Sequence, residues 1–556
     1  MDAFFRFLDG VNAVMLSVPM LLALLFTGVL FTVWSGFCQY RSLTHGAGLI
    51  TGRWQSGKGP GAISHFQALS AALSATVGLG NIAGVAIAVE LGGPGAVFWM
   101  WMVGIAGMAI KTFEVTLSML YRNTQDPDNP HGGTMWVAKR GLPELLPSLA
   151  RAGGWVGGLF CLPLILFAVT GGNMFQSWSV ATNAEIYFGV PMWLTGVVLA
   201  VVVGLVIIGG IRRIGQIAGM IVPFMCGLYV ICGLGVIVAN IEAMPAVFGL
   251  IFHSAFNPAE ASGAFIGAGV GTAFIFGMKR ALFSSEAGLG SAPIAHSAVR
   301  TKEPVTEGVV AGLEPFVDTL VVCTITALVI LSSGAWNRAP SAEFDTRPRM
   351  SIEADGSYVP ARAELPAGRL QAGDTVFAHA RITVSDSEER MGRLYGDVQS
   401  VTAGRARIDW RPLYAEDAMT VSMVDGGLYR NLPGAALTAY AFDSAQPGLG
   451  RWMVTLTIFM FAISTIITWS YYGEQGWLYL SKGRGVLVYR GLWCALIVVP
   501  CLGFVRTVTE IDTLSTVALG FMLAINLPLM WLLGSRGMAA WKDYFRRLDA
   551  GKITEV

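Results

Sequence analysis

The apolar run Phe66–Leu91 constrains the chain more than any other feature, because it is long enough to cross a bilayer yet contains helix-breaking glycines. Gly78, Gly80 and Gly84 interrupt it within the stretch Ser74–Gly84, SATVGLGNIAG. In hydrocarbon an unsatisfied backbone N–H or C=O costs several kcal/mol, so a broken helix survives only where protein or a cavity supplies partners. One interpretation is that the glycines let a neighbouring helix approach closely. The other, which we favour, is a discontinuous helix whose freed backbone groups bind a substrate and a cation.

Composition places this run in a polytopic membrane protein. Of the 556 residues, 54% are hydrophobic and only 13% are charged. The 37 basic and 36 acidic residues nearly cancel, and nothing in their distribution indicates a nucleic-acid partner. The seven cysteines lie in or beside apolar runs without metal-ligand spacing, so we interpret them as packed side chains. Eleven predicted spans fall near residues 14–34, 66–91, 93–121, 155–181, 191–210, 214–239, 263–294, 306–333, 451–480, 486–505 and 513–534.

Basic residues in the loops predict the orientation, because they are retained on the cytoplasmic side. The loops Asn183–Val190 and Asn240–Gly263 carry no Lys or Arg, whereas the loops on the other side and the C-terminal tail are basic. We therefore predict an external N-terminus and a cytoplasmic C-terminus, with Arg506 as the one exception. The basic residues are Arg41, Arg53, Lys58, Arg122, Lys139, Arg140, Arg151, Arg212, Arg213, Arg300, Lys302, Lys482, Arg484, Arg490, Arg536, Lys542, Arg546 and Arg547.

One segment, Gly334–Gly450, breaks the membrane pattern. It is polar and Pro-rich, and it alternates in short runs typical of β-strands near residues 381–384, 398–401, 406–410 and 419–424. The topology places it outside, and it lacks cysteine, so disulfides do not staple it. We interpret it as a small extracytoplasmic insert with an accessory or folding role; the alternative is a ligand-binding insert on a transporter-derived receptor. The predicted parts are 1–62 with an extra N-terminal helix, 63–333, 334–450, 451–535 and a cytoplasmic tail 536–556.

A second interrupted helix, Gly263–Ile294, begins five helices after the first. Its break is Phe283–Pro293, FSSEAGLGSAP. Without the first helix of the chain, the other ten form two sets of five, each opening with a broken helix, and an odd number per set gives opposite orientations. This pattern predicts an all-α secondary transporter with a 5+5 inverted repeat and a site between the breaks. Half-helix N-termini suit a carboxylate, and exposed carbonyls suit sodium, so an amino acid and a sodium ion fit together.

Six motifs, in order along the chain, resemble the alanine/glycine:cation symporters. The resemblance covers nearly the whole chain except the insert. It implies a leucine-transporter-type fold, sodium-coupled uptake of a small neutral amino acid and a place in the plasma (inner) membrane. The chain departs from the family's usual TGTGN or VGTGN at Leu79 and from its FSNEAG at Ser285, so we expect substrate identity to depend on these positions. The motifs are ALSATVGLGNIAGVA at 72–86, GGPGAVFWMWMVGIAG at 92–107, GNMFQSWSVA at 172–181, GGIRRIG at 209–215, FSSEAGLGSAPIAH at 283–296 and FAISTIITWSYYGE at 461–474.

Positions within these motifs supply the candidate site. The backbone at the first break would hold the substrate carboxylate, the glutamine of GNMFQ resembles the family's substrate-contacting glutamine, and two aromatic residues would wall the pocket. Alternatively, the glutamine and the aromatics pack between helices, and the hydroxyls bond back to their own helix. The substrate candidates are Thr76, Gly78, Leu79, Gly80, Asn81, Gln176, Phe283, Ser284, Ser285 and Trp469. The sodium candidates, which resemble the usual arrangement of the fold, are Ala75, Gly78, Phe461, Ser464 and Thr465.

Ionisable side chains within membrane runs are expensive, and they are functional candidates by default. Glu286 could cap a half-helix or order a gate, and Asp318 could carry a proton, which keeps H+ as an alternative to Na+ as coupling ion. No nucleophile–base arrangement, phosphate loop or metal cluster is visible, so we predict no enzyme and no covalently bound cofactor. For the others we expect an interfacial Glu90, a Lys111–Glu114 pair, Lys279 and Arg280 pairing with Glu286, and interfacial or packing roles for His65 and His296.

Overall fold

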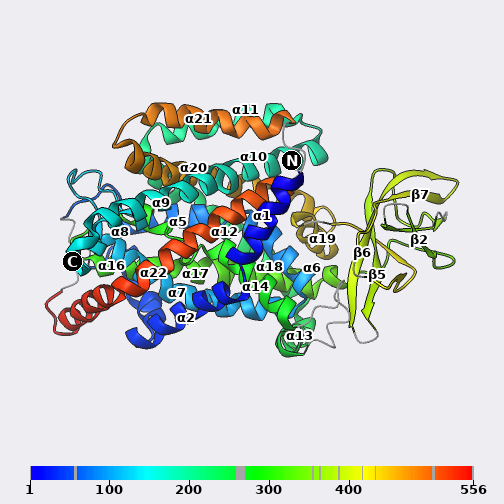
Figure 1. Ribbon diagram of the computed structural model, residues 1–556, viewed down its shortest axis with the longest axis horizontal. Coiled ribbons are helices and arrows are strands. Elements are labelled where there is room, and N and C mark those ends of the chain that lie inside the picture. The colour runs from blue at the N-terminus through cyan, green and yellow to red at the C-terminus, as the bar shows by residue number, and fades with distance from the viewer. Residues whose placement is uncertain are drawn as a thin grey trace.

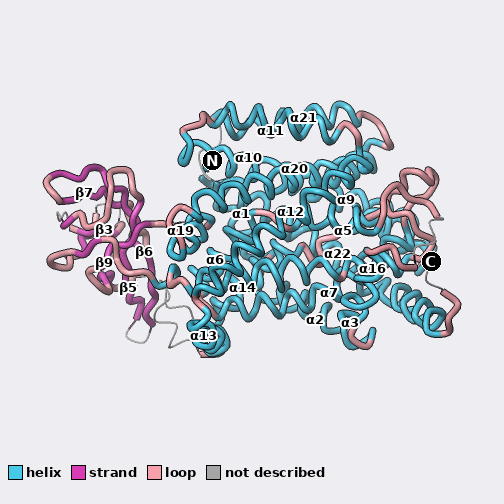
Figure 2. Tube along the Cα trace, turned by 180° about the vertical axis from the view of Figure 1, so that it is seen from behind, coloured by secondary structure: helices cyan, strands magenta, loops and turns pink. Residues whose placement is uncertain are grey.

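The structure, a computed structural model, is a bundle of helices with a strand region attached to one end. It describes residues 2–54, 59–257, 270–353, 356–361, 365–385, 388–415, 418–432, 434–503 and 508–553. Most helices run along the long axis of the molecule, the strands gather at one end, and the C-terminus lies near the other (Figures 1 and 2). The strand region and the C-terminus therefore lie at opposite ends of the bundle.

The helical part contains several helices that are interrupted by π-helical or 3-10 turns, labelled η. Its elements are α1 (Asp2–Met15), α2 (Val18–Ser35), α3 (Cys38–Arg41), η1 (Ser42–Gly46), α4 (Ala47–Ile50), α5 (His65–Thr76), η2 (Gly80–Gly84), α6 (Val85–Gly92), α7 (Gly95–Tyr121), α8 (Thr134–Leu145), η3 (Pro147–Leu149), α9 (Ala150–Val169), η4 (Thr170–Met174), α10 (Phe175–Phe188), α11 (Met192–Ile207), α12 (Gly210–Ala239), η5 (Ile241–Ala243), α13 (Met244–Phe256), α14 (Val270–Ser285), α15 (Ala292–His296), α16 (Pro304–Ala311), α17 (Leu313–Pro315), η7 (Phe316–Cys323), α18 (Thr324–Ser332), η8 (Ala335–Asn337), α19 (Ala435–Ala445), α20 (Leu449–Ser481), α21 (Val486–Val498), η9 (Val499–Leu502) and α22 (Val508–Asp549).

Several of these helices are long and apolar enough to span a membrane, so the chain is a multi-pass membrane protein. Among the described residues, seven single helices pass that test, and the pair α5 and η2–α6 passes it together with a bend of 53°. Each predicted run coincides with helix where it is described; the start of the run 263–294, together with Lys58 and Arg506, lies outside the described residues. The predicted loop Asn240–Gly263 is wrong in part, because η5 and α13 occupy it. The count of eleven spans stays a prediction.

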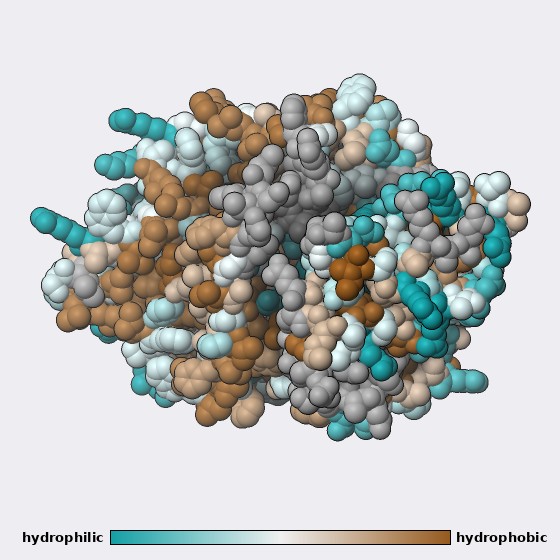
Figure 3. All heavy atoms as spheres, turned by 45° about the vertical axis from the view of Figure 1, so that its right-hand side comes forward, coloured by the Kyte–Doolittle hydropathy of each residue, from teal (hydrophilic) through white to brown (hydrophobic). Residues whose placement is uncertain are grey.

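Large hydrophobic side chains remain exposed along the helices at the edge of the bundle, as expected where lipid is the solvent. On α11 and α21, for example, Trp193 and Leu487 are 53% and 77% exposed. These two helices lie together at one edge of the bundle (Figure 1). In the space-filling view, hydrophobic residues cover much of the helical part, and hydrophilic residues gather over the strand region (Figure 3).

The strand region forms an antiparallel sheet with its own core. The sheet order is β1-β9-β5-β6-β7-β4, with β8 also on β5, and β2 and β3 form a separate pair. Leu365, Val376, Leu394 and Leu428 are buried in a cluster distinct from the helical core. The four predicted strand runs fall in or across β5 to β8. The strands are β1 (Ala342–Glu343), β2 (Met350–Ile352), β3 (Tyr358–Pro360), β4 (Leu365–Pro366), β5 (Thr375–Ser385), β6 (Glu388–Thr402), β7 (Arg405–Trp410), β8 (Thr420–Met423) and β9 (Gly427–Arg430).

The strand region is joined to the first broken helix by a buried ion pair. Arg393 Nη1 on β6 lies 2.8 Å from Glu90 Oε1 on α6, and both side chains are almost fully buried. The place of Glu90 at the membrane interface stays a prediction, and the structure adds its ion pair with the strand region. The predicted end of the insert at Gly450 also includes α19, which belongs to the helical core, since Thr438 Oγ1 donates to the carbonyl of Ile82 at 3.0 Å.

Candidate functional site

The first break lies between α5 and η2, and its sequence supplies the partners that a broken helix needs. A capping box of Ser64 and Gln67 starts α5. The helix ends at Thr76, and the next residues turn away from it. The freed N–H of Gly78 donates to Asn81 Oδ1 at 2.8 Å. A Cβ on Gly78 would lie only 3.0 Å from Thr465 Oγ1, so glycine lets the neighbouring helix α20 approach.

The second break, between α14 and α15, is held by side chains from two other helices. The backbone is left-handed at Glu286, Gly288 and Gly290, with φ of 53°, 84° and 79°. The N–H of Gly290 donates to Glu114 Oε1 at 2.6 Å, and Asn526 Nδ2 donates to the carbonyl of Gly288 at 2.9 Å. Buried backbone groups that leave the helix are thus paired again, as an apolar environment requires. Glu286, which is not a glycine, adopts its left-handed conformation under strain.

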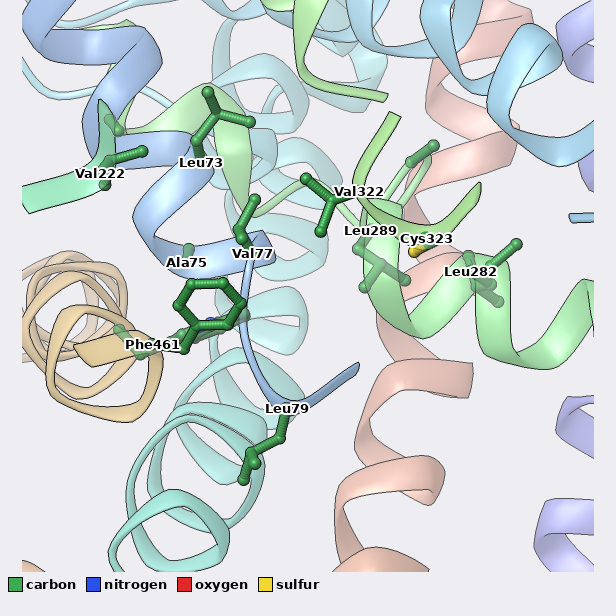
Figure 4. Packing of buried hydrophobic residues seen from close by; sticks show 14 of the residues in the cluster. Leu73, Ala75, Val77, Leu79, Val222, Leu282, Leu289, Val322, Cys323 and Phe461 are labelled. Carbon is green, nitrogen blue, oxygen red and sulfur yellow. The ribbon is translucent and has the colours of Figure 1, made fainter. Parts of the chain in front are cut away.

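A narrow cavity lies where the two breaks meet. Its volume is about 300 Å³. Close by, Phe461 lies beside Ala75 and Val77, and Leu79 follows on the unwound segment (Figure 4). The cavity is lined by Ala75, Thr76, Gly78, Leu79, Gly80, Phe167, Gly171, Gln176, Phe283, Glu286, Thr465 and Trp469.

Aromatic side chains from three helices wall this cavity. The ring centroid of Phe167 lies 4.6 Å from that of Trp469 and 5.9 Å from that of Phe283. A Cβ on Gly172 would lie 2.5 Å from Trp469 Cβ, so glycine is required for the indole to sit here. Phe167 was missed by the sequence reasoning, because it lies before the GNMFQ motif in an ordinary apolar run. Of the predicted wall residues, Phe283 and Trp469 both line the cavity.

Gln176 has one hydrogen-bonding atom left for a ligand. Its Nε2 donates to the carbonyl of Gly171 at 3.1 Å, whereas its Oε1 is buried and has no hydrogen-bond partner among the described residues. Leaving a buried acceptor unsatisfied costs about 1–3 kcal/mol. Because Gln176 lines the cavity, its oxygen can accept a hydrogen bond from a bound ammonium group or hydroxyl.

A polar network behind the cavity ties the two breaks together. Asn81 Nδ2 donates to Ser284 Oγ at 3.0 Å and to Asp318 Oδ1. Ser284 Oγ and Thr319 Oγ1 each donate to Asp318 Oδ2 at 2.8 Å. Asn81 and Ser284, together with Ser285, do not line the cavity. They lie beside the lining residues, and Asp318 is enclosed by hydrogen bonds.

Hydroxyl groups of α20 face the end of α5, close to the predicted sodium site. Thr465 Oγ1 donates to the carbonyl of Ser74 at 3.1 Å, and Ser464 Oγ donates to the carbonyl of Phe461 at 2.9 Å. Ser74 Oγ donates to the carbonyl of Ser464 at 2.7 Å and accepts from Thr468 Oγ1 at 3.0 Å. Ser74 and Thr468 were missed, because neither belongs to the Ser464–Thr465 pair that resembles the fold's usual arrangement. The cluster contains only neutral oxygen atoms, the donor type that sodium prefers.

Several predicted ion pairs are wrong, because the buried carboxylates find partners far along the chain. Lys111 Nζ contacts Glu314 Oε2 at 3.1 Å rather than Glu114. Glu286 Oε2 accepts from Ser291 Oγ at 2.7 Å, and Lys279 and Arg280 form no ion pair among the described residues. His65 and His296 do not simply pack: both contact Glu307, and His296 also contacts Glu314.

Lys279 and Arg280 instead line a second cavity of about 730 Å³. Residues of α1 and α22, among them Asn12 and Asp512, line its other walls. Phe283 lines this cavity and the narrow one alike, so its ring is the part of the wall that the two cavities share.

A cavity between two interrupted helices of a multi-pass helical bundle is the arrangement of a membrane transporter. The sequence model described as the Sodium:alanine symporter family matches residues 1–353 and 416–556. The chain therefore belongs to this family. Residues 354–415, which include β3 to β7, lie outside the match.

Named relatives agree with this family. The Sodium/alanine symporter AgcS of Methanococcus maripaludis is 36% identical over 488 residues, which cover 88% of this chain and 86% of AgcS. The Putative sodium/proton-dependent alanine carrier protein YrbD of Bacillus subtilis is 32% identical, with 98% and 93% covered. The Probable sodium/glutamine symporter GlnT of the same species is 29% identical, with 97% and 91% covered. Among solved structures, MhsT in complex with L-phenylalanine has a TM-score of 0.48 at 12% identity, covering 87% of this chain and 92% of MhsT.

Proposed function

We propose that this protein couples the sodium gradient to uptake of a small neutral amino acid, such as alanine or glycine, by alternating access. The observation that carries the proposal is the unpaired Oε1 of Gln176 in the narrow cavity between the two broken helices. The substrate ammonium group would donate to this oxygen. Its carboxylate would bind the unwound backbone around Thr76–Gly80, where half-helix N–H groups carry partial positive charge.

The size of the cavity favours a substrate with a short side chain. The rings of Phe167, Phe283 and Trp469 line a cavity of only about 300 Å³, so a long side chain would have to displace a ring. In this assignment Ser284, Ser285 and Asn81 position the lining residues rather than touch the substrate. Leu79 lines the cavity where the family usually has threonine, and so adds an apolar group beside the substrate.

The coupling ion that we propose is Na+, bound by the carbonyls of Ala75, Gly78 and Phe461 and the hydroxyls of Ser464 and Thr465. This donor set fits sodium because it is all oxygen and carries no formal charge, and the described residues hold no cluster of His, Cys, Asp or Glu that would suit a divalent metal. Three of its members, Ala75, Gly78 and Thr465, line the substrate cavity, so the ion and the substrate would occupy neighbouring positions.

For the architecture we propose the 5+5 inverted repeat with eleven spans, in the leucine-transporter manner, in the plasma membrane. The strand region would lie outside with the N-terminus, and the tail after α22 would be cytoplasmic. The support is the basic loops on one side and the position of the strand region and the C-terminus at opposite ends of the bundle (Figure 1).

The decisive experiment is uptake by the purified protein in liposomes. With an inward sodium gradient, labelled alanine or glycine should accumulate, and a potassium gradient should give none. A panel of neutral amino acids would define the substrate, and Leu79→Thr in the same assay would show whether the departure at this position sets selectivity. Accumulation without sodium would refute sodium coupling. Accumulation driven by a proton gradient alone would favour the proton, which the printed name of the relative YrbD includes.

A further inference from the structure

A continuous network of five buried ionisable side chains lies outside the proposed substrate and sodium sites. His65 Nδ1 on α5 contacts Glu307 Oε2, and Glu307 Oε1 contacts His296 Nδ1. His296 Nε2 lies 2.6 Å from Glu314 Oε1, and Lys111 Nζ donates to Glu314 Oε2 at 3.1 Å. Every one of these side chains is at most 3% exposed. This network of side chains joins α5, α15, α16, α17 and α7.

The chemistry of His296 requires one more proton than a neutral ring supplies. A neutral imidazole has one N–H donor and one lone pair, and an ionised carboxylate can only accept. Both ring nitrogens of His296 contact carboxylate oxygens, one on Glu307 and one on Glu314. If both carboxylates are ionised, both nitrogens must carry a proton. The ring is then an imidazolium, and with Lys111 it places two cations against two anions, which is how buried charges are retained.

Other charged groups lie near this network of side chains, on the elements that pack against it. Glu114 of α7 and Glu286 of the second break lie near Lys111, and the guanidinium of Arg122 donates to the carbonyls of Ser297 and Val299, directly after His296. Glu114 is already held by Gly290 and Asn526. These contacts leave Glu307 and Glu314 as the carboxylates that His296 itself touches.

This network of side chains connects one half of the first broken helix to one half of the second. His65 begins the first half of one broken helix, and His296 ends the second half of the other. Just beyond them the backbones pair directly: Ala62 N donates to the carbonyl of Ala298 at 2.7 Å, and Arg300 N to that of Ile63 at 2.9 Å. If one repeat moves against the other during alternating access, opening this end of the protein breaks these links.

We propose that His296 is a proton-binding site, and that its doubly protonated ring latches the two broken helices together at the end of the protein opposite the strand region. Opening releases one proton from the ring to water at that face, and the neutral ring keeps only one carboxylate partner. A low pH at that face therefore holds the latch closed, and a high pH favours opening. The role in transport rests on the proposed function.

Glu307→Gln separates this role from a structural one. The amide oxygen of glutamine can accept from His65, and its NH2 group can donate to a neutral His296 ring, which still donates to Glu314. The variant latch is thus fully hydrogen-bonded without the extra proton. Glu314→Gln serves as a second variant, because its amide can donate to His296 and accept from Lys111. As a control, His45→Gln removes another buried histidine, which contacts Tyr544 and does not belong to this network of side chains.

Two measurements test the proposal. In liposomes with a fixed sodium gradient, initial alanine uptake by the wild type should rise about tenfold as the pH inside increases, which corresponds to about 1.4 kcal/mol for one weakened link. The control should keep this dependence and Glu307→Gln should flatten it. Nitrogen NMR of labelled histidine in membranes should show one ring with both nitrogens protonated at about pH 8, above the ordinary imidazole pKa of about 6.5. This resonance should be missing in His296→Gln.

Each outcome decides one question. A wild type without any sodium-driven uptake would refute the proposed function, while the NMR result would still test the proton on His296. Sodium-driven uptake whose pH dependence is the same in the wild type and Glu307→Gln would refute the latch. A wild-type His296 ring with a single proton at about pH 8 would refute the binding site.

Discussion

Ser284 and Ser285 offer a matched pair of substitutions at the second break. Both are fully buried neighbours, but their hydroxyls differ in what they hold. Ser284 Oγ accepts from Asn81 at 3.0 Å and donates to Asp318 at 2.8 Å, whereas among the described residues Ser285 Oγ accepts only from the N–H of Ala287, at 3.4 Å. A hydrogen bond to a charged group contributes about 1.5–3 kcal/mol and a neutral one about 0.5–1.5 kcal/mol. We therefore expect Ser284→Ala to reduce the stability of the protein by about 2–4 kcal/mol, and Ser285→Ala by less than about 1 kcal/mol.

The measurement is the rate of thermal inactivation in one detergent, since large membrane proteins unfold irreversibly and their stability is best expressed as a rate. A loss of about 2 kcal/mol corresponds to a roughly 30-fold change in rate if the network breaks before the inactivation step. Ser284→Ala should inactivate at least about fivefold faster than Ser285→Ala. Sodium-driven uptake should fall in the same order. Equal rates for the two variants would refute the inference that the network around Asp318 ties the two breaks together.

Further predictions concern the cavity and the strand region. Gln176→Leu should raise the KM for alanine about tenfold or more, since it removes an acceptor for a charged donor; an unchanged KM would contradict ammonium binding there. Gly172→Ala places a Cβ 2.5 Å from Trp469 Cβ and should cost about 1–3 kcal/mol while reducing alanine uptake more than glycine uptake. Either Glu90→Gln or Arg393→Gln alone should reduce the stability, measured by thermal inactivation, by about 3–5 kcal/mol. The double variant should lose less than the sum of the two, and strict additivity would argue against the buried pair.

The length and hydrophobicity of the apolar runs predicted most of the helical part. The predicted runs coincide with helices because a segment of roughly 20 apolar residues has few alternatives to helix in hydrocarbon. The miss at Asn240–Gly263 has a physical reason. The helix Ile241–Phe256, made of η5 and α13, is only 16 residues long, too short to be recognised as a span, and its apolar face is recognisable only against α7 and α14. Similarly, α8 contains Pro143 and two basic residues, which disguise it as a loop.

The broken backbone of the candidate site and several of its lining side chains were predictable, whereas the partners of the buried charged side chains were not. Gly78 and Gly80 mark the break in the sequence itself, so the cavity-lining role of the backbone followed from helix physics. Lys111 shows the opposite case. The spacing of three residues on one helix suggested Glu114 as its partner, yet its partner is Glu314, 203 residues away along the chain. Only the packing of α17 on α7 places that carboxylate within reach, and Glu114 is free to hold the second break instead.

Two buried polar networks connect the broken helices, and they differ in the side chains that form them. The network of Asn81, Ser284 and Asp318 consists of amide and hydroxyl donors around one carboxylate, and none of these three residues is a histidine. The chain through His296 and Glu307 depends on a proton that the ring can lose. The proposed alternating-access cycle requires one tie between the broken helices that lasts through the cycle and one that opens at a single face. The composition of the two networks matches these two requirements, which is why the stability test belongs at Ser284 and the pH test at Glu307.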